Sequence, residues 1–361
     1  MQIIELEFTK LGDTTDAGAT TQGQIGKLRR QFQSSNINVL LGAGFSIAVV
    51  GLLGDYEQKL ADAQFDYDFL GGADAYKELV DLQQGFFRTS ILPLSDPEKV
   101  RKGEVERAIF LSFIMGIVSN RQSAILHKIV NVFTTNYDLL IEAALEKKHI
   151  DYVDGFAGKL RPTFSTANYG MILSRQTSIS SMTSEVVTVN LYKVHGSLNW
   201  RCDNEVVVCQ DHVAAIKNVN TMLGTDGFIR EYNELAIINP TKEKLNTTVL
   251  NANYYDQLRM FCNELEKSNT ILLSFGFSFN DEHIRQMTER SLKGNPTLAL
   301  IIFSFNSAAT EQYEKFFESY QNVSVIQLIE SSAEDEEEPA VMDCTLARAN
   351  AVLEEIFNGT K

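Results

Sequence analysis

The chain has 361 residues, of which 44% are apolar, and its formal net charge is −15. This length and composition are typical of a globular protein with a sizeable core, in one large domain or two ordinary ones. They exclude a membrane helix, because no run approaches the roughly 18 apolar residues that one needs, and the acidic balance argues against a broad cationic surface for nucleic acid.

The first residues and the cysteines indicate an intracellular protein. The opening stretch, MQIIELEFTK, lacks the basic region and apolar core of a secretion signal. The four cysteines, Cys202, Cys209, Cys262 and Cys344, contain no Cys-x-x-Cys pair, so their spacing excludes a four-cysteine zinc ribbon. We therefore expect reduced thiols, a cytoplasmic location and no metal site.

The two ends of the chain differ from its middle. Residues 10–23 are small and polar and predict a flexible surface loop, so we assign 1–23 to an N-terminal strand and this loop. The following segment, 24–33, predicts a short amphipathic helix. At the other end, 331–361 predicts a solvated acidic loop and a last helix, which leaves 24–330 as the main domain.

Seven β-rich apolar runs and four helical patterns occupy this main domain. Most of the runs are continuous rather than alternating, as in strands that helices cover on both faces. Their alternation with helices predicts an α/β fold with a doubly wound, mostly parallel, Rossmann-like sheet. The runs are 37–44, 128–136, 187–197, 235–240, 270–278, 297–305 and 323–329, and the helical patterns are 137–148, 254–268, 281–294 and 307–320.

Two segments interrupt this alternation. Residues 55–127 contain three or four helical patterns and one proline pair, Pro93 and Pro97. Residues 151–234 are mixed and rich in Ser, Thr and Asn, with a β-hairpin predicted at 198–210. We interpret both segments as insertions in one nucleotide-binding core rather than as separate domains.

The first candidate for chemistry follows the run 37–44, because ligands of an open α/β sheet bind at the carboxyl ends of its strands. In Gly42-Ala43-Gly44-Phe45-Ser46, the two glycines allow close backbone approach, a following helix N-terminus can hold a pyrophosphate, and Ser46 can donate a hydroxyl. An ordinary strand-to-helix turn explains the motif equally well. Ile47 stands where a dehydrogenase fingerprint needs its third glycine.

The second and third candidates follow the next two strands. Thr135, Asn136 and Asp138 cluster where the run 128–136 stops, although Asn136 or Thr135 could simply cap the next helix, with Asp138 in its first turn. His195 precedes Gly196 and can exchange a proton near neutral pH. A lone histidine is more often structural, so this residue alone decides nothing.

Two further strand ends carry polar groups. Gly276 and Ser278 end a strongly apolar strand and are candidates for ligand contact, whereas Asp281 is better explained as the N-cap of the next helix. Ser304 and Asn306 end the run 297–305, where they could bond ribose hydroxyls or begin the next turn.

These strand ends, in this order, resemble the sirtuin-like NAD-binding family. The matching motifs are Gly42-Ala43-Gly44-Phe45-Ser46, Thr135-Asn136-Tyr137-Asp138, His195-Gly196-Ser197 and Gly276-Phe277-Ser278. Their details are similar to the bacterial antiphage-defence branch. The protein deacylases of the family carry a zinc ribbon and a Gly-Ile-Pro-x-Phe-Arg segment, and this sequence has neither.

The resemblance implies that the chain hydrolyses NAD, as its substrate, to nicotinamide and ADP-ribose without a metal. Asn136 would position the ribose or the attacking water, Asp138 would hold the nicotinamide side or order Asn136, and His195 would be the general base. Contacts to the rest of NAD would come from Gly42, Ala43, Gly44, Ser46, Thr135, Gly276, Ser278 and Asn306, with the glycine loop at the phosphates and the last three residues at the adenosine half.

The resemblance also implies a latent effector of a bacterial antiphage defence system, which depletes NAD, assembles as a homo-oligomer and is paired with a HerA-type hexameric ATPase. The alternative is a non-catalytic sensor that binds NAD or ADP-ribose and regulates a partner ATPase or nuclease. A protein deacylase fits less well without a zinc ribbon. A dehydrogenase also fits less well, because no acidic residue ends a clear second strand about 20 residues after the glycine loop.

Overall fold

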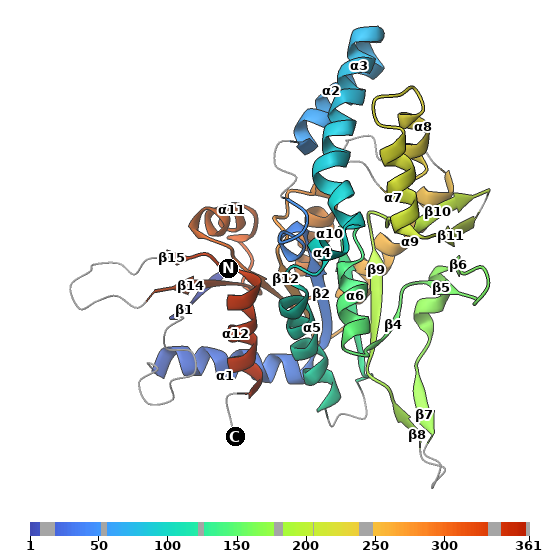
Figure 1. Ribbon diagram of the computed structural model, residues 1–361. Coiled ribbons are helices and arrows are strands. Elements are labelled where there is room, and N and C mark those ends of the chain that lie inside the picture. Colours follow the sequence, from blue (N-terminus) through green and yellow to red (C-terminus); the bar gives the residue numbers. More distant parts are fainter. Residues whose placement is uncertain are drawn as a thin grey trace.

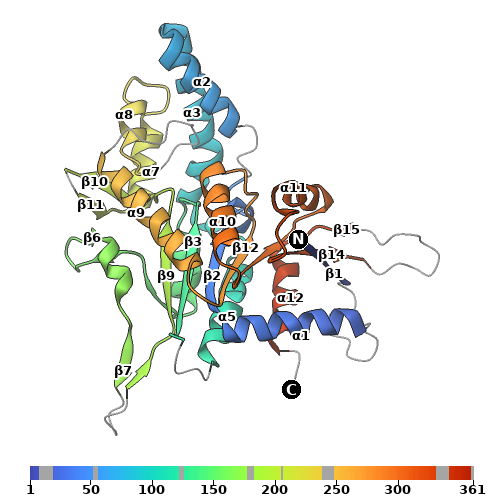
Figure 2. The ribbon, with the colours of Figure 1, turned by 180° about the vertical axis from the view of Figure 1, so that it is seen from behind.

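The computed structural model describes residues 1–7, 19–51, 56–121, 126–176, 183–204, 206–237, 248–330 and 341–358. One large sheet organises them, with the strand order β1-β14-β13-β12-β2-β3-β9-β4 (Figures 1 and 2). All these neighbours pair in parallel, and β15 pairs antiparallel with β14. The strands are β1 (Gln2–Glu7), β2 (Asn36–Leu41), β3 (Ile129–Thr134), β4 (Asp151–Val153), β9 (Thr188–Lys193), β12 (Thr270–Phe275), β13 (Leu298–Phe303), β14 (Val323–Ile329) and β15 (Val341–Met342).

Helices cover both faces of this sheet, so the predicted doubly wound α/β fold is confirmed. In β2, Val39 and Leu41 belong to the apolar core on one face, whereas Leu40 belongs to the core on the other. This is why the strand sequences are continuously apolar. One face carries α1 (Ala19–Ser34), α5 (Glu104–Ser119), α6 (Leu140–Lys147) and α12 (Leu346–Asn358), and the other carries α9 (Thr248–Leu265), α10 (Glu282–Gly294) and α11 (Ser307–Phe317) (Figures 1 and 2).

The segment 55–127 divides into two parts. The pair α2 (Tyr56–Leu70) and α3 (Ala73–Phe86) projects away from the sheet at the top of Figure 1, whereas α5 packs on the sheet. Three short helical stretches connect them: η3 (Phe87–Ile91), η4 (Leu92–Ser95) and α4 (Pro97–Val100).

The segment 151–234 also divides, because it contributes β4 and β9 to the central sheet. A separate antiparallel sheet contains the predicted hairpin, in which Asp203 pairs with Val206. Its strands are β5 (Phe156–Ala157), β6 (Thr163–Phe164), β10 (Trp200–Asp203) and β11 (Val206–Cys209). The remaining elements are η5 (Thr166–Gly170), β7 (Ser174–Gln176), β8 (Thr183–Glu185), α7 (His212–Thr221) and α8 (Phe228–Asn233).

Some predicted boundaries are wrong or lie outside the described residues. Helix α1 begins at Ala19, inside the segment predicted as a loop, and α6 begins at Leu140 rather than at residue 137. Of the run 235–240, the described part forms only an isolated bridge between Ile237 and Gly196. Residues 8–18, 238–247 and 331–340 lie outside the described part, so the predictions for the rest of that run and for the two loops stay predictions.

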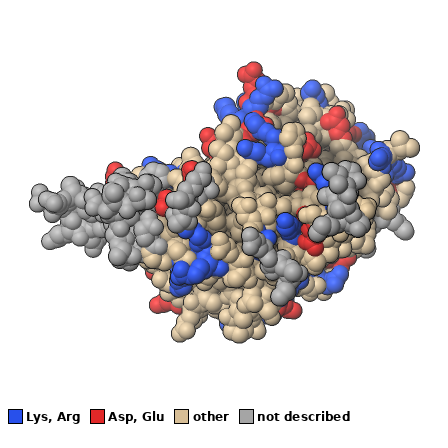
Figure 3. All heavy atoms as spheres, turned by 90° about the horizontal axis from the view of Figure 1, so that it is seen from below, with Lys and Arg blue, Asp and Glu red and all other residues tan. Residues whose placement is uncertain are grey.

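The described surface is mixed in charge. Figure 3 views the molecule from the side of α1, where Lys and Arg side chains alternate with Asp and Glu and no broad surface of one sign is seen among the described residues. None of the helices in these ranges combines the length and apolar composition that a membrane crossing requires.

A row of buried asparagines crosses three central strands. Asn38, Asn131 and Asn190 lie directly opposite one another on β2, β3 and β9. Asn131 donates to the Asn38 Oδ1 at 2.9 Å and accepts from the Asn190 Nδ2 at 3.0 Å. These two bonds form only in this alignment, so the row selects one register for the centre of the sheet.

Replacing only the middle member, as in Asn131→Val, should lower the free energy of unfolding by at least about 2 kcal/mol, because it leaves buried groups of Asn38 and Asn190 unpaired. The triple variant, with valine at all three positions, should lose less than this single variant, because no member of the row is left unpaired. Glu264, which also accepts from Asn131 and so loses that bond in both variants, keeps its ion pair with Lys267. Urea unfolding of the wild type and both variants measures the difference. A triple loss larger than the single loss would contradict this explanation.

Candidate functional site

The ends of β2 and β12 touch through their backbones. The Gly42 N–H donates to the Phe275 carbonyl at 3.1 Å, and the Gly44 N–H donates to the Gly276 carbonyl at 3.0 Å. A Cβ on Gly42 would lie 2.4 Å from the Gly276 oxygen, and one on Gly44 would lie 2.6 Å from the Gly276 Cα. The glycines are therefore required by the meeting of two strands, before any ligand is considered.

This contact lies at the topological switch of the sheet. After β2 the chain adds β3 and β9 on one side, and later adds β12, β13 and β14 on the other. Connections leave β2 and β12 in opposite directions at such a point, which opens a crevice at the carboxyl ends of the strands. The site predicted from the strand ends therefore lies where this fold class binds its ligands.

The chain beyond the glycines forms no long helix. Residues Ala43–Phe45 make a single 3₁₀ turn, and the N–H groups of Val49 and Val50 donate to the Ser46 carbonyl. Phe45 is buried against Phe110 and Phe275, whereas the Ile47 side chain is exposed. The loop therefore differs from that of a dehydrogenase, in which a helix begins directly under the pyrophosphate.

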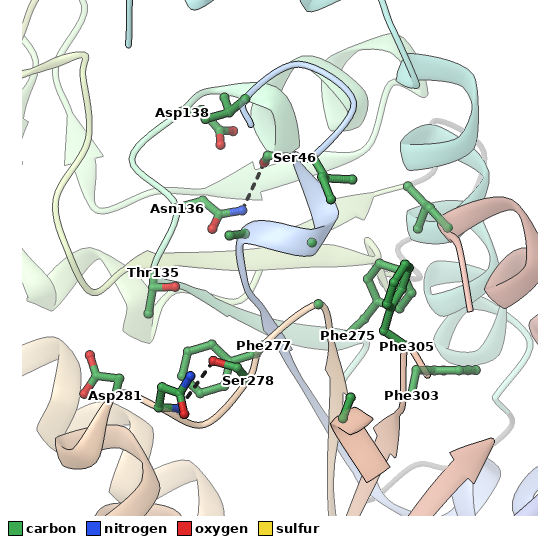
Figure 4. A pocket seen from close by; sticks show the side chains of 18 of the residues that line it. Ser46, Thr135, Asn136, Asp138, Phe275, Phe277, Ser278, Asp281, Phe303 and Phe305 are labelled. Carbon is green, nitrogen blue, oxygen red and sulfur yellow. Dashed lines mark hydrogen bonds between the residues drawn. The ribbon is translucent and has the colours of Figure 1, made fainter. Parts of the chain in front are cut away.

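Asn136 is held rigidly against the glycine loop. Its Nδ2 donates to the Gly42 carbonyl at 2.9 Å and to the Ser46 Oγ at 3.0 Å, and its backbone N–H donates to the Thr134 Oγ1 (Figure 4). Both amide hydrogens are therefore used. The Oδ1 makes no hydrogen bond with a described residue, so it is the atom that can accept one from a ligand.

His195 pairs with an acid from a distant part of the chain. Its Nε2 lies 3.1 Å from the Asp281 Oδ2, while the Asp281 Oδ1 accepts from the N–H groups of His283 and Ile284 and caps α10. The cap fixes the carboxylate, which in turn fixes the imidazole. In the neutral ring this pairing places the proton on Nε2, and Nδ1 makes no hydrogen bond within the described ranges.

An unusual backbone conformation brings Asp281 into this position. Phe279 has a φ of +58°, a left-handed conformation that bulky residues rarely adopt. Its ring is fully buried against Tyr313 and Phe317, and its carbonyl accepts from the Arg285 Nη1 at 3.1 Å. Packing therefore compensates for the strained turn that brings Asp281 beside His195.

Asp138 contacts the next helix rather than Asn136. Its Oδ1 accepts from the Leu140 N–H at 2.9 Å, so Asp138, and not Asn136 or Thr135, satisfies the start of α6. Lys193 on β9 is fully buried, bonds the Asp138 carbonyl, and forms an ion pair with Glu142 at 3.0 Å. Burial raises the pKa of Glu142, and the charge of Lys193 opposes that rise. This pair ties the Asp138 segment to β9.

One cavity, of about 410 Å³, collects most of the predicted residues. Ala43, Gly44, Ser46, Thr135, Asn136, Asp138, His195, Gly276 and Ser278 all line it. Two predicted residues do not: Gly42 lies beneath the loop, and the Asn306 side chain caps α11 by accepting from the Ala309 N–H at 3.0 Å. A contact of either residue with a ligand stays a prediction.

The cavity also contains residues that the sequence did not reveal. Asp281 lines it beside His195, and Figure 4 shows Phe275, Phe303 and Phe305 grouped at one side of it. Cys344 and Leu346, from the segment that leads into α12, complete this apolar side. Aromatic residues follow both β12 and β13 in the sequence, which is the only signal that could have indicated this part of the site.

The sequence profile of the SIR2-like domain matches residues 130–326, which is 197 of the 361 residues. The chain belongs to the SIR2-like domain family. No curated protein matches it in sequence. The match begins at β3 and includes Asn136, His195 and Gly276, so the predicted membership of the sirtuin-like family is confirmed.

Two solved structures are similar to the SIR2-like chain at low sequence identity. One, titled "Sir2-p53 peptide-NAD+", is 13% identical, with 93% of this chain and 99% of that chain covered and a TM-score of 0.46. The other, titled "The Structural basis for Sirtuin Substrate affinity", is 14% identical, with 91% and 96% covered and a TM-score of 0.43. The family assignment rests on the sequence match alone.

The SIR2-like site contains no recognisable metal centre within the described ranges. No group of three or more His, Cys, Asp or Glu side chains there is arranged to hold a metal ion. Cys202, Cys209, Cys262 and Cys344 are free, and the last two are buried.

The glycine contact can be tested through Gly276→Ala. At a φ of +66°, the new Cβ would lie 2.7 Å from the Gly44 Cα and 2.8 Å from the Phe45 nitrogen, so one of the two strand ends must move. The free energy of unfolding should fall by at least about 2 kcal/mol. Gly116→Ala, whose new Cβ would meet nothing within 4 Å in the last turn of α5, is the matched control and should be neutral or stabilising. Equal losses in a denaturant titration would refute the contact's role.

Proposed function

We propose that this SIR2-like domain hydrolyses NAD to nicotinamide and ADP-ribose. One observation carries the proposal: Asn136 and His195 line the same cavity, and each is fixed by other bonds while one acceptor atom stays open toward a ligand. A binding module would need the glycine loop but not a histidine oriented by a buried carboxylate.

The reaction needs little covalent help from the protein. When the bond between the nicotinamide nitrogen and the ribose C1′ breaks, its electron pair goes to the nitrogen and leaves neutral nicotinamide. Positive charge develops on the ribose, as in other glycoside hydrolyses. The oxygen of water bonds to C1′, and one proton is released with ADP-ribose. The protein must therefore orient the ribose, admit one water and accept that proton.

The open acceptors match these tasks. The Asn136 Oδ1 would accept a hydrogen bond from a ribose hydroxyl or from the attacking water, held in place by the glycine loop. The His195 Nδ1 would accept the proton, and Asp281 at 3.1 Å would stabilise the resulting imidazolium. Asp138 would face the developing positive charge, since it lines the cavity and is almost fully buried.

The remaining lining residues would hold the rest of NAD. Ala43, Gly44 and Ser46 would contact the phosphates, as the resemblance implies, and Ser278 would face the adenosine half. The aromatic side of the cavity, with Phe303 and the half-exposed Phe305, offers flat apolar surfaces against which an adenine ring would pack.

We also propose, as the resemblance implies, that the activity is latent and serves bacterial antiphage defence through NAD depletion. We propose that the chain assembles with itself and pairs with a HerA-type ATPase. The projecting α2–α3 pair would supply the contact surface. Phe65, Phe69 and Leu70 of α2 are 65%, 77% and 71% exposed, although they are large and apolar. Side chains of this kind at the tip of a projection favour protein contact.

Nicotinamide release from NAD tests the hydrolase. Asn136→Ala and His195→Ala should each lower the rate at least about 100-fold, because one removes the ribose or water contact and the other removes the base. Asp281→Asn preserves the cap on α10 but removes the charge, so it should lower the rate while leaving the unfolding temperature close to that of the wild type.

His283→Ala is the matched control, because this histidine lies on α10 near the site but its side chain is exposed. It should keep the wild-type rate. If the purified chain binds NAD or ADP-ribose in all its assembled states without releasing nicotinamide, it is a sensor and the proposed hydrolase function is wrong. Peptide deacetylation that depends on NAD would instead support a deacylase.

A further inference from the structure

Arg107 on α5 is buried with few hydrogen bonds. Its side chain is 1% exposed, its Nη2 donates to the Val100 carbonyl at 2.9 Å, and its Nε and Nη1 have no partner among the described residues. Burial lowers the pKa of the guanidinium below its usual range. A buried charge with two of its three nitrogens unpaired destabilises a fold, so selection for packing alone does not explain an arginine here.

This guanidinium borders the turn that closes the cavity. A Cβ placed on Gly103 would lie 3.2 Å from the Arg107 Nη1 and 3.2 Å from the Ala48 Cβ, so both groups border the same point. Ala48 belongs to the Ser46–Val50 turn, whose neighbouring residues Ile47 and Val50 line the cavity. Arg107 therefore lies on one side of this turn, and the cavity lies on the other side.

The charge inside the cavity is unbalanced for an anionic ligand. Two carboxylates, Asp138 and Asp281, line it, and the lining contains no Lys or Arg within the described ranges. Asp138 is also the acid whose charge acts most strongly on Arg107, which shows that the guanidinium and the site share one electrostatic environment. A diphosphate would add two negative charges to a site that lacks a cation.

The turn between Arg107 and the cavity is anchored at both ends but lightly held in its middle. Ser46 is 2% exposed and accepts from the Asn136 Nδ2, and Val50 is buried in an apolar cluster. Between them, Ile47 and Ala48 are exposed, and the N–H groups of Val49 and Val50 bond only the Ser46 carbonyl within the same turn. Few tertiary contacts therefore oppose a shift of Ile47 and Ala48.

We propose that Arg107 is the cation that binds the phosphates of the ligand, once Ile47 and Ala48 shift aside while Ser46 and Val50 stay in place. The open Nε and Nη1 donors form one edge of the guanidinium, which suits two parallel bonds to phosphate oxygens. This assignment rests on the proposed function only for the ligand class, a nucleoside diphosphate. It requires no hydrolysis.

Arg107→Met tests the assignment, because methionine fills a similar apolar space without charge. Thermal unfolding without ligand should occur at the wild-type temperature or above it, since a buried unpaired charge is removed. Calorimetric titration should show at least a tenfold weaker affinity for ADP-ribose and an unchanged affinity for adenosine, which has no phosphate. Arg107→Lys keeps the charge but loses the planar pair of donors, so its affinity for ADP-ribose should lie between those of the wild type and Arg107→Met.

The other outcomes are equally decisive. Exposed Arg88→Met on η3 is the control and should match the wild type in every measurement. If Arg107→Met binds ADP-ribose like the wild type, or if both Arg107 variants unfold at clearly lower temperatures, the residue is structural and the assignment is wrong. If the wild type binds neither ADP-ribose nor inorganic pyrophosphate, the assignment is also wrong. Nicotinamide release from NAD, measured on the same preparation, tests the proposed hydrolase function independently of the Arg107 assignment.

Discussion

The backbone contact between the ends of β2 and β12 is the constraint on which the site depends. Because Gly42 and Gly44 lie directly against Gly276, the two strand ends have no space for side chains between them. The Gly42 carbonyl is left to orient Asn136, and the chain beyond Gly276 is directed toward β9. The glycine loop, Asn136 and the pair of His195 with Asp281 are therefore all positioned by this one backbone contact.

Much of this arrangement was predictable from the sequence, because parallel strands place their carboxyl ends together. The continuous apolar runs predicted the sheet, and polar residues after β2, β3, β9 and β12 predicted most of the cavity. The glycine loop is instructive in this respect. Its motif alone was ambiguous between a ligand loop and a plain turn, and the structure shows that close strand packing requires its glycines in any case.

Other features depend on strand order, which local patterns do not contain. The sequence predicted Asp281 as a helix cap, and the structure confirms the cap. Its contact with His195 arises only because the strand order places the two segments side by side. The asparagine row is likewise invisible until β2, β3 and β9 are placed in register. Arg107 reads as one more charge on a helix, because nothing in its sequence neighbourhood indicates complete burial. For Asn306, which also follows a strand, the structure shows a cap on α11, and its contact with a ligand stays a prediction.

The contact between His195 and Asp281 joins the two halves of the sheet across the switch point. Translation delivers Asn136 and His195 first, and the ribosome adds Asp281 only after many further residues. A nascent or truncated chain that stops before β12 thus has neither the strand that seats the glycine loop nor the carboxylate that orients the imidazole. If the chain consumes a shared metabolite as proposed, this order of synthesis would keep unfinished chains inactive.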